Sequence, residues 1–183
     1  MDLNAILEKI KTCVWLIPEN RFDDLTKDKG YVDSFIYFLI ITALSIPVVL
    51  ISSFLNPSGL MVAVFAIPMM FVLGIPLSYV GFLILFALLK LFGGKADLLK
   101  TIQVFIYGGT SSTIFGGLPI IGIVPGVVSL INIVKGAARV HQMQWWKVVI
   151  AIIVIPLIVL TIVIVVVGMY FTTLKVGLIP VPK

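Results

Sequence analysis

The sequence predicts an all-α protein, specifically a polytopic bundle of transmembrane helices. Hydrophobic residues make up 61% of the 183-residue chain. Three long stretches, 34–89, 101–134 and 148–174, contain no Asp, Glu, Lys, Arg or His. A helix crosses a bilayer core of about 30 Å with about 20 apolar residues, so each stretch can hold at least one crossing. The predicted location is therefore the membrane, with the chain crossing it several times.

The residues before the first stretch are predicted to form an amphipathic helix. Apolar residues recur at helical spacing from Leu3 to Ile17, and Pro18 ends the pattern. Beside a membrane, such a helix is expected to lie in the headgroup plane with Trp15 as its anchor. The alternative is a helix that binds a partner. Charged residues interrupt this segment throughout, so we do not predict a cleaved signal peptide.

The uncharged stretches are predicted to hold five spans. An Asn-Pro-Ser-Gly sequence divides the first stretch, and a Gly-Gly-Leu-Pro sequence divides the second. The second span exceeds the membrane core and should kink near Pro68, Gly74 or Pro76. One half of 101–134 could instead be re-entrant. The predicted organisation is a cytoplasmic arm (1–33), a membrane domain (34–174) with spans at roughly 35–55, 60–89, 101–115, 118–134 and 148–174, and a short outer tail (175–183).

The basic residues predict the orientation of these spans. With five spans, eleven of the 13 Lys and Arg residues lie on one side, and only Lys175 and Lys183 lie on the other. The positive-inside rule then places the amino terminus in the cytoplasm and the carboxyl terminus outside. Six spans would nearly equalise the two sides. Four spans would preserve most of the bias, so the charges hardly distinguish four spans from five. The length of 101–134 and its Gly-Gly-Leu-Pro sequence favour five.

The acidic residues concentrate in the amino-terminal arm. Seven of the eight Asp and Glu residues precede Ser34, whereas the two inner connections carry a net positive charge. Two interpretations follow. The arm folds back against the basic connections, or it is a solvated tail, because exposed ion pairs contribute only about 0–1 kcal/mol each.

Inside the predicted spans we find no residues suited to catalysis or ion coupling. Proton relays and ion-coupled transporters generally need a buried ionisable side chain, which these spans lack. The single histidine, His141, lies in a predicted inner loop, and Cys13 is the single cysteine. We therefore expect no enzyme, no cofactor and no metal. The dispersed basic residues also argue against nucleic-acid binding. The polar cluster 107–113 is expected to pack helices, or to line a cavity mouth for a solute or lipid headgroup.

Several short motifs follow the second predicted span. They are Gly-Gly-Lys (93–95), Tyr-Gly (107–108), Leu-Pro-Ile-Ile-Gly (118–122), Lys-Gly-Ala-Ala-Arg-Val-His (135–141) and Trp-Trp-Lys (145–147). Together with Pro18 and Phe22 they resemble the Yip family, membrane proteins named for their interaction with Ypt/Rab GTPases. The resemblance implies five spans, a cytoplasmic amino terminus and a binding or scaffold role in trafficking.

The chain departs from the eukaryotic members of that family. It lacks their long cytosolic amino-terminal region and their Asp-Leu-Tyr-Gly-Pro signature. Ser111 stands where their Gly-Tyr-x-x-x-Pro motif has proline, and Ile106 stands where it has glycine. A short prokaryotic-type member, located in the cell membrane, is the expectation, and a Rab partner is not assumed.

Within the resemblance, seven residues are candidates for interaction or packing: Gly94, Tyr107, Pro119, Gly136, Arg139, His141 and Trp145. In the functional interpretation, the inner end of the fourth span binds a partner, and His141 titrates near neutrality. In the structural interpretation, Gly136 permits tight packing or a helix end, and His141 caps or pairs within the loop.

The predicted function is a non-enzymatic membrane scaffold or adaptor that organises partner proteins or lipids. Its expected partners are membrane lipids and either another protein or a second copy of the chain. The alternative is a small permease or channel-like protein for an uncharged or lipidic solute, because the lack of buried charge argues against ion coupling but not against facilitated passage.

Overall fold

The computed structural model describes residues 3–27, 30–54, 59–118 and 120–177, and within these ranges it is helical without strands. This confirms the predicted all-α class. In chain order the elements are α1 (Leu3–Val14), α2 (Glu19–Leu25), α3 (Tyr31–Phe54), α4 (Gly59–Met69), η1 (Met70–Gly74), α5 (Ile75–Leu91), α6 (Leu98–Gly108), α7 (Thr110–Phe115), α8 (Ile123–His141), α9 (Trp145–Val149), η2 (Ile150–Val154) and α10 (Ile155–Gly177).

Four helical segments in the described ranges are long and apolar enough to cross a membrane: Tyr31–Phe54, Met61–Leu91, Ile123–His141 and Trp145–Val167. The chain is thus a multi-pass membrane protein. The predicted span 101–115 corresponds to two short helices, α6 and α7, which meet at Gly109. The count of five spans and their orientation stay predictions.

Helix α8 begins and ends later than the predicted span 118–134. It runs to His141, and its last turn is closed by Gln142 in the left-handed conformation, with φ of 53°. The amide of Met143 donates to the Ala138 carbonyl at 2.9 Å, and that of Gln142 donates to the Arg139 carbonyl at 3.3 Å. These two bonds form a Schellman motif, which satisfies carbonyls at the helix end.

Two π-helical turns interrupt the long apolar helices, and each ends two residues before a proline. Turn η1 ends at Gly74 before Pro76, and η2 ends at Val154 before Pro156. Proline lacks an amide hydrogen, and its ring clashes with the carbonyl four residues earlier. A wider π turn accommodates both effects without ending the helix. The irregularity expected near Gly74 and Pro76 therefore takes the form of a π turn.

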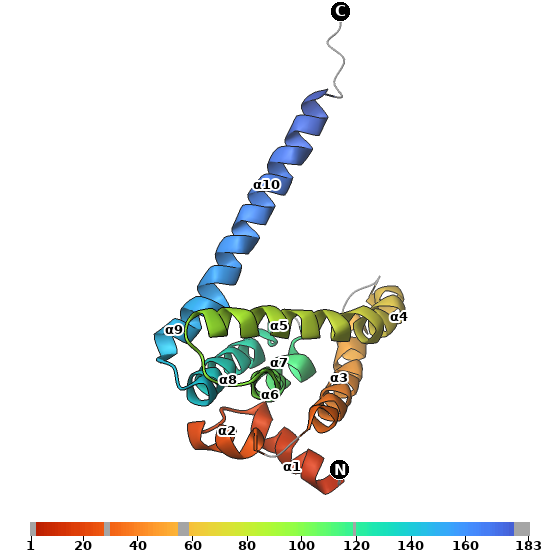
Figure 1. The fold of residues 1–183 in the computed structure, drawn as a ribbon. Helices are drawn as coiled ribbons and strands as arrows, with labels where there is room; N and C mark the ends of the chain where they lie inside the picture. Colours follow the sequence, from red (N-terminus) through yellow and green to blue (C-terminus); the bar gives the residue numbers. More distant parts are fainter. Residues whose placement is uncertain (1–2, 28–29, 55–58, 119, 178–183) are drawn as a thin grey trace, which may run out of the picture.

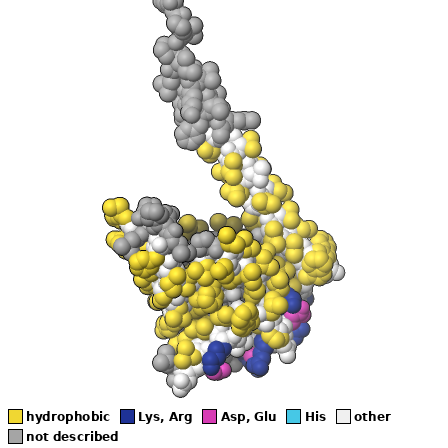
Figure 2. Space-filling model, turned by 180° about the vertical axis from the view of Figure 1, so that it is seen from behind, with side chains coloured by type: hydrophobic (Ala, Val, Ile, Leu, Met, Phe, Trp, Pro, Cys, Tyr) yellow, Lys and Arg dark blue, Asp and Glu magenta, His cyan; other side chains and the backbone are white. Residues whose placement is uncertain are grey.

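The helices surround α6, which is buried on all sides from Thr101 to Gly108. Helices α1 and α2 cover one end of the molecule, α5 crosses the opposite side, and α10 extends away from the rest (Figure 1). In the reverse view, hydrophobic side chains cover most of the face, while charged side chains gather at the end opposite α10 (Figure 2). The molecule therefore has one polar end and, on this face, a broad apolar surface.

The apolar stripe of α1 contacts the protein itself. Ile6, Cys13 and Ile17 are buried, and Ile10 and Val14 pack against the same core. The arm therefore folds back on the bundle, as one of the two charge-based interpretations predicted, and is not a solvated tail. Its depth relative to the headgroups stays a prediction.

Candidate interaction surface between the arm and helix α8

Three residues on one face of α8 hold the amino-terminal arm. Asn132, Gly136 and Arg139 are separated by four and three residues, a spacing that aligns side chains along one side of a helix. Each contacts a different part of the arm, from the α1–α2 linker to the middle of α2. Together they define the docking face of α8.

Asn132 binds the linker between α1 and α2 through both ends of its buried side-chain amide. Its Oδ1 accepts a hydrogen bond from the Ile17 amide at 2.9 Å. Its Nδ2 donates to the Trp15 carbonyl at 2.8 Å. One side chain thus satisfies two backbone groups that no helix bond would satisfy, because the linker lies outside both helices.

Gly136 provides the space that α2 needs. A Cβ atom built on Gly136 would lie 2.5 Å from Cε1 of Phe22, well inside van der Waals contact. The Phe22 ring is fully buried. Because the ring sits directly on the backbone of α8, any side chain at position 136 would push α2 away.

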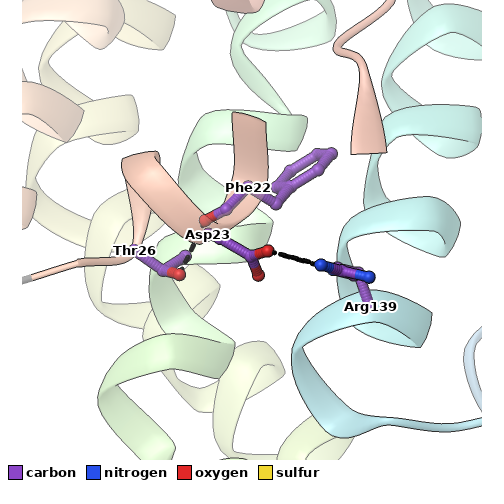
Figure 3. Close-up of polar contacts among 4 residues, drawn as sticks. All are labelled: Phe22, Asp23, Thr26 and Arg139. Atoms are coloured by element: carbon purple, nitrogen blue, oxygen red, sulfur yellow. Dashed lines mark hydrogen bonds and ion pairs between the residues drawn. The ribbon is translucent and has the colours of Figure 1, made fainter. Parts of the chain in front are cut away.

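Arg139 forms an ion pair with Asp23 of α2 (Figure 3). Its Nε and Nη2 donate to Asp23 Oδ2 at 3.1 and 2.7 Å. The hydrogen bond from the guanidinium, followed by its charge, holds the pKa of Asp23 below its ordinary value. Both side chains are about half exposed, at 52% and 51%, so the pair is solvent-screened and contributes modestly to stability.

A polar cleft opens where α2 meets the end of α8. Its volume is about 670 Å³. Acidic and basic side chains line it together: Asp23, Asp24, Lys27, Lys100 and Arg139. The hydroxyl of Thr26, also at the cleft, donates to the Phe22 carbonyl at 2.7 Å and closes the end of α2 (Figure 3). One wall of the cleft is therefore the closed last turn of α2.

His141 is fully buried and belongs to the packing of the loop that precedes α6. Its Nε2 lies 2.9 Å from Thr101 Oγ1, whose hydroxyl also contacts the Asp97 carbonyl at 2.8 Å. Both contacts are satisfied together when Thr101 donates to Asp97 and accepts from His141. Nδ1 of the ring faces Gly94, where a Cβ atom would collide with it. His141 and Gly94 therefore pack against each other and do not present a surface.

Tyr107 lies at the centre of the bundle beside a buried lysine of α1. The Lys9 Nζ donates to the Tyr107 hydroxyl at 3.3 Å and lies 4.9 Å from the centre of its ring. The ring of Tyr37 packs edge-on against Tyr107, with centroids 4.9 Å apart. A lysine held over two aromatic rings gains cation–π attraction that offsets part of its desolvation. This contact ties α1 to α3 and α6.

The structure thus separates the candidate residues into groups. Gly136 and Arg139 belong to the docking face, and Gly94, His141 and Tyr107 are buried in packing contacts. Trp145 is the first residue of α9, is 68% exposed and lines a groove between α8 and α9. Pro119 lies outside the described residues.

Sequence reasoning missed the importance of several residues that now stand out. They are Lys9, Asp23, Thr101 and Asn132. The only signal available for Asn132 was an amide within an apolar helix, four residues before Gly136. Within the described ranges, no group of three or more His, Cys, Asp or Glu side chains is arranged to hold a metal ion.

The fold and surface define a multi-pass helical membrane protein whose polar arm is docked on an apolar bundle. The chain belongs to the Yip1 domain family, whose family model matches residues 12–167 and so includes α2, the last residues of α1 and most of the bundle. This is a family of membrane proteins linked to trafficking, and it is not a known enzyme family. Its members in general interact with Rab/Ypt partners. Searches of curated proteins and of solved structures return no significant match.

Proposed function

We propose that the chain is a non-enzymatic membrane scaffold or adaptor that binds a partner protein at the polar cleft between α2 and the end of α8. The observation that carries this proposal is the docking of the arm. Asn132, Gly136 and Arg139 hold α2 in one position, and the cleft forms along the resulting junction. A surface that is already ordered loses less conformational entropy on binding.

The charge pattern of the cleft supports a protein as the occupant. Asp23 and Asp24 lie near Lys27, Lys100 and Arg139, so both signs occur within one opening. Nucleic acids favour uniformly basic surfaces, whereas protein surfaces present both signs and can match such a pattern. Membership in a trafficking-linked family supports the same interpretation.

Site-specific photocrosslinking in native membranes tests this proposal. A photoreactive residue at Gln142, which lines the cleft, should give one discrete protein adduct. The same residue at Val80 of α5, an exposed position on an apolar helix, is the control and should give mainly lipid adducts. An adduct between two copies of the chain would identify the partner as a second copy.

Charge reversal makes the test specific to the cleft. The double variant Lys27→Glu/Lys100→Glu should lower the Gln142 adduct several-fold, since both ammonium groups line the cleft. Lys11→Glu, an exposed position on α1 that does not line the cleft, is the matched control and should leave the adduct unchanged. A Gln142 adduct that is absent, or equally strong in the double variant, contradicts the adaptor role.

The permease alternative makes a different prediction. Purified protein in liposomes would then accelerate the passage of an uncharged solute such as glycerol, and substitution within 110–113 would abolish that passage. Flux equal to that of protein-free liposomes supports the adaptor, whereas accelerated and 110–113-dependent flux replaces it.

A further inference from the structure

A second hollow, separate from the polar cleft, lies between α8 and the helix formed by α9 and η2. Its volume is about 390 Å³. Its walls are almost entirely apolar, with Leu130, Ile131 and Val134 from α8 facing Val149 of α9 and Ile153 of η2. Both helices belong to segments long and apolar enough to cross a membrane. The groove therefore has the character of a site for a hydrocarbon chain.

The polar residues of this groove lie together at one end. On α8, Lys135 follows Ile131 by one helical turn, and on the facing segment Trp145 precedes Val149 by one turn. Lys135 and Trp145 are both exposed. Tryptophan and lysine are favoured at the membrane–water boundary. The groove is thus apolar along its length and polar at its mouth. This distribution matches a phospholipid, which has apolar acyl chains and a polar headgroup at one end.

The mouth carries one charge of each sign. Glu19 of α2 lines the groove together with Lys135, and both side chains are exposed. In the part of the chain that the structure describes, neither forms a salt bridge with the other or with a third residue. Neither side chain is therefore held in a contact ion pair, although Glu19 also interacts electrostatically with Arg139. An anionic headgroup would satisfy Lys135 but meet repulsion from Glu19.

We propose that this groove binds a zwitterionic phospholipid, with the phosphate at Lys135, the ammonium group at Glu19 and an acyl chain along the apolar wall. A headgroup with one negative and one positive charge complements both side chains, and charge-assisted hydrogen bonds are stronger than neutral ones. The site lies apart from the polar cleft, so it does not depend on the adaptor proposal.

Native mass spectrometry of the purified full chain tests the assignment. The protein is titrated with phosphatidylethanolamine and with phosphatidylglycerol of identical acyl chains. The wild type should retain several-fold more phosphatidylethanolamine. Equal retention of the two lipids, or a preference for phosphatidylglycerol, overturns the proposal, because either result shows that Glu19 does not select the headgroup.

Charge variants of the mouth provide the decisive comparison. Glu19→Lys should reverse the preference toward phosphatidylglycerol, because the mouth then carries two cations. The exchange variant Glu19→Lys/Lys135→Glu retains one charge of each sign and should restore the preference for phosphatidylethanolamine. Restoration also excludes misfolding as the cause of the reversal. Glu8→Lys, outside the groove on α1, is the matched control and should behave as wild type. An unchanged ratio in Glu19→Lys overturns the proposal.

Discussion

The polar end of the molecule and its apolar helices are held together by different forces. At the polar end, side-chain hydrogen bonds join segments far apart in the chain, as Asn132 joins Ile17 and Arg139 joins Asp23. In the outer apolar helices α5 and α10, the hydroxyl groups of Ser78 and Thr161 bond instead to carbonyls of their own helical segment. The first kind of bond specifies a tertiary arrangement, whereas the second satisfies a polar group without specifying a neighbour.

The contrast in exposure leads to the same conclusion. The described side chains of α10 from Leu157 to Val167 are largely exposed, and lipid is the natural solvent for such a surface. Since lipid tails are as apolar as these side chains, no hydrophobic force drives such helices together. The specific structure of this protein should therefore depend most on the arm and its docking face. Substitutions in the two regions test that difference.

The largest effect is expected from Asn132→Leu. This change leaves the buried Ile17 amide and the part-buried Trp15 carbonyl without their partner, and an unsatisfied buried group costs about 1–3 kcal/mol. Docking of the arm should weaken by about 2–4 kcal/mol. Hydrogen exchange across residues 3–27 should rise steeply, while exchange in α5 should remain unchanged.

Ser78→Ala is the matched control for Asn132→Leu, since it removes a bond within one continuous helical segment, from Ser78 of α5 to the Gly74 carbonyl at the end of η1. It should change the free energy of unfolding by less than about 0.5 kcal/mol, as expected for a substitution that breaks no contact between distant segments. Unchanged arm protection in Asn132→Leu would show that docking of the arm does not depend on the two hydrogen bonds of Asn132, and would contradict the contrast between the two regions.

The next effect in size is expected from Gly136→Ala. The added methyl group meets the buried ring of Phe22, and overpacking of this kind costs about 1–3 kcal/mol. Thermal unfolding should shift downward, and protease should cleave the arm faster. Adding Phe22→Ala to Gly136→Ala should lessen the effect of the alanine at 136, because the colliding ring is gone.

Gly126→Ala, in the same helix, is the control for Gly136→Ala. A Cβ atom there has no neighbour within 4 Å, and alanine has the better helix propensity by about 1 kcal/mol. The two variants should therefore shift stability in opposite directions. Equal behaviour of the two would contradict the close approach of α2 and α8.

Sequence patterns predicted where the helices lie along the chain better than they predicted which residues contact each other in the fold. Missing charges identified the apolar stretches, and the helical stripe identified α1, because both signals are local. The partners of Asn132 lie 115 and 117 residues away, and no periodicity encodes such a contact. The resemblance to a family singled out Gly136 and Phe22 separately, but only the structure brings them together.

Element boundaries were harder to predict where the chain is uncharged. The run 101–134 contains no charge to mark a helix end, so its division rested on the Gly-Gly-Leu-Pro sequence. The structure adds a break at Gly109 and extends α8 to His141. From the sequence, His141 is placed in an inner loop, with partner binding and pairing within the loop as the two interpretations. Its burial against Gly94 and Thr101 depends on a loop from another part of the chain.

The smallest effect concerns the ion pair of Asp23 with Arg139, the exposed part of the docking face. Because the pKa of Asp23 is lowered in the folded protein, the pair stabilises the arm above the ordinary carboxyl pKa of about 3.9 and is lost as the pH falls below it. Because both partners are about half exposed and screened by solvent, the contribution should be the smallest of the three. Asp23→Asn should therefore weaken arm protection slightly at pH 6 and less at pH 3, in hydrogen exchange corrected for intrinsic rates. Asp24→Asn, whose carboxylate forms no salt bridge within the described residues, is the control and should match wild type at both values. If Asp23→Asn and Asp24→Asn behave alike at pH 6, the arm is held by Asn132 and Phe22 alone, and the contrast between the two regions depends on buried contacts rather than on charge.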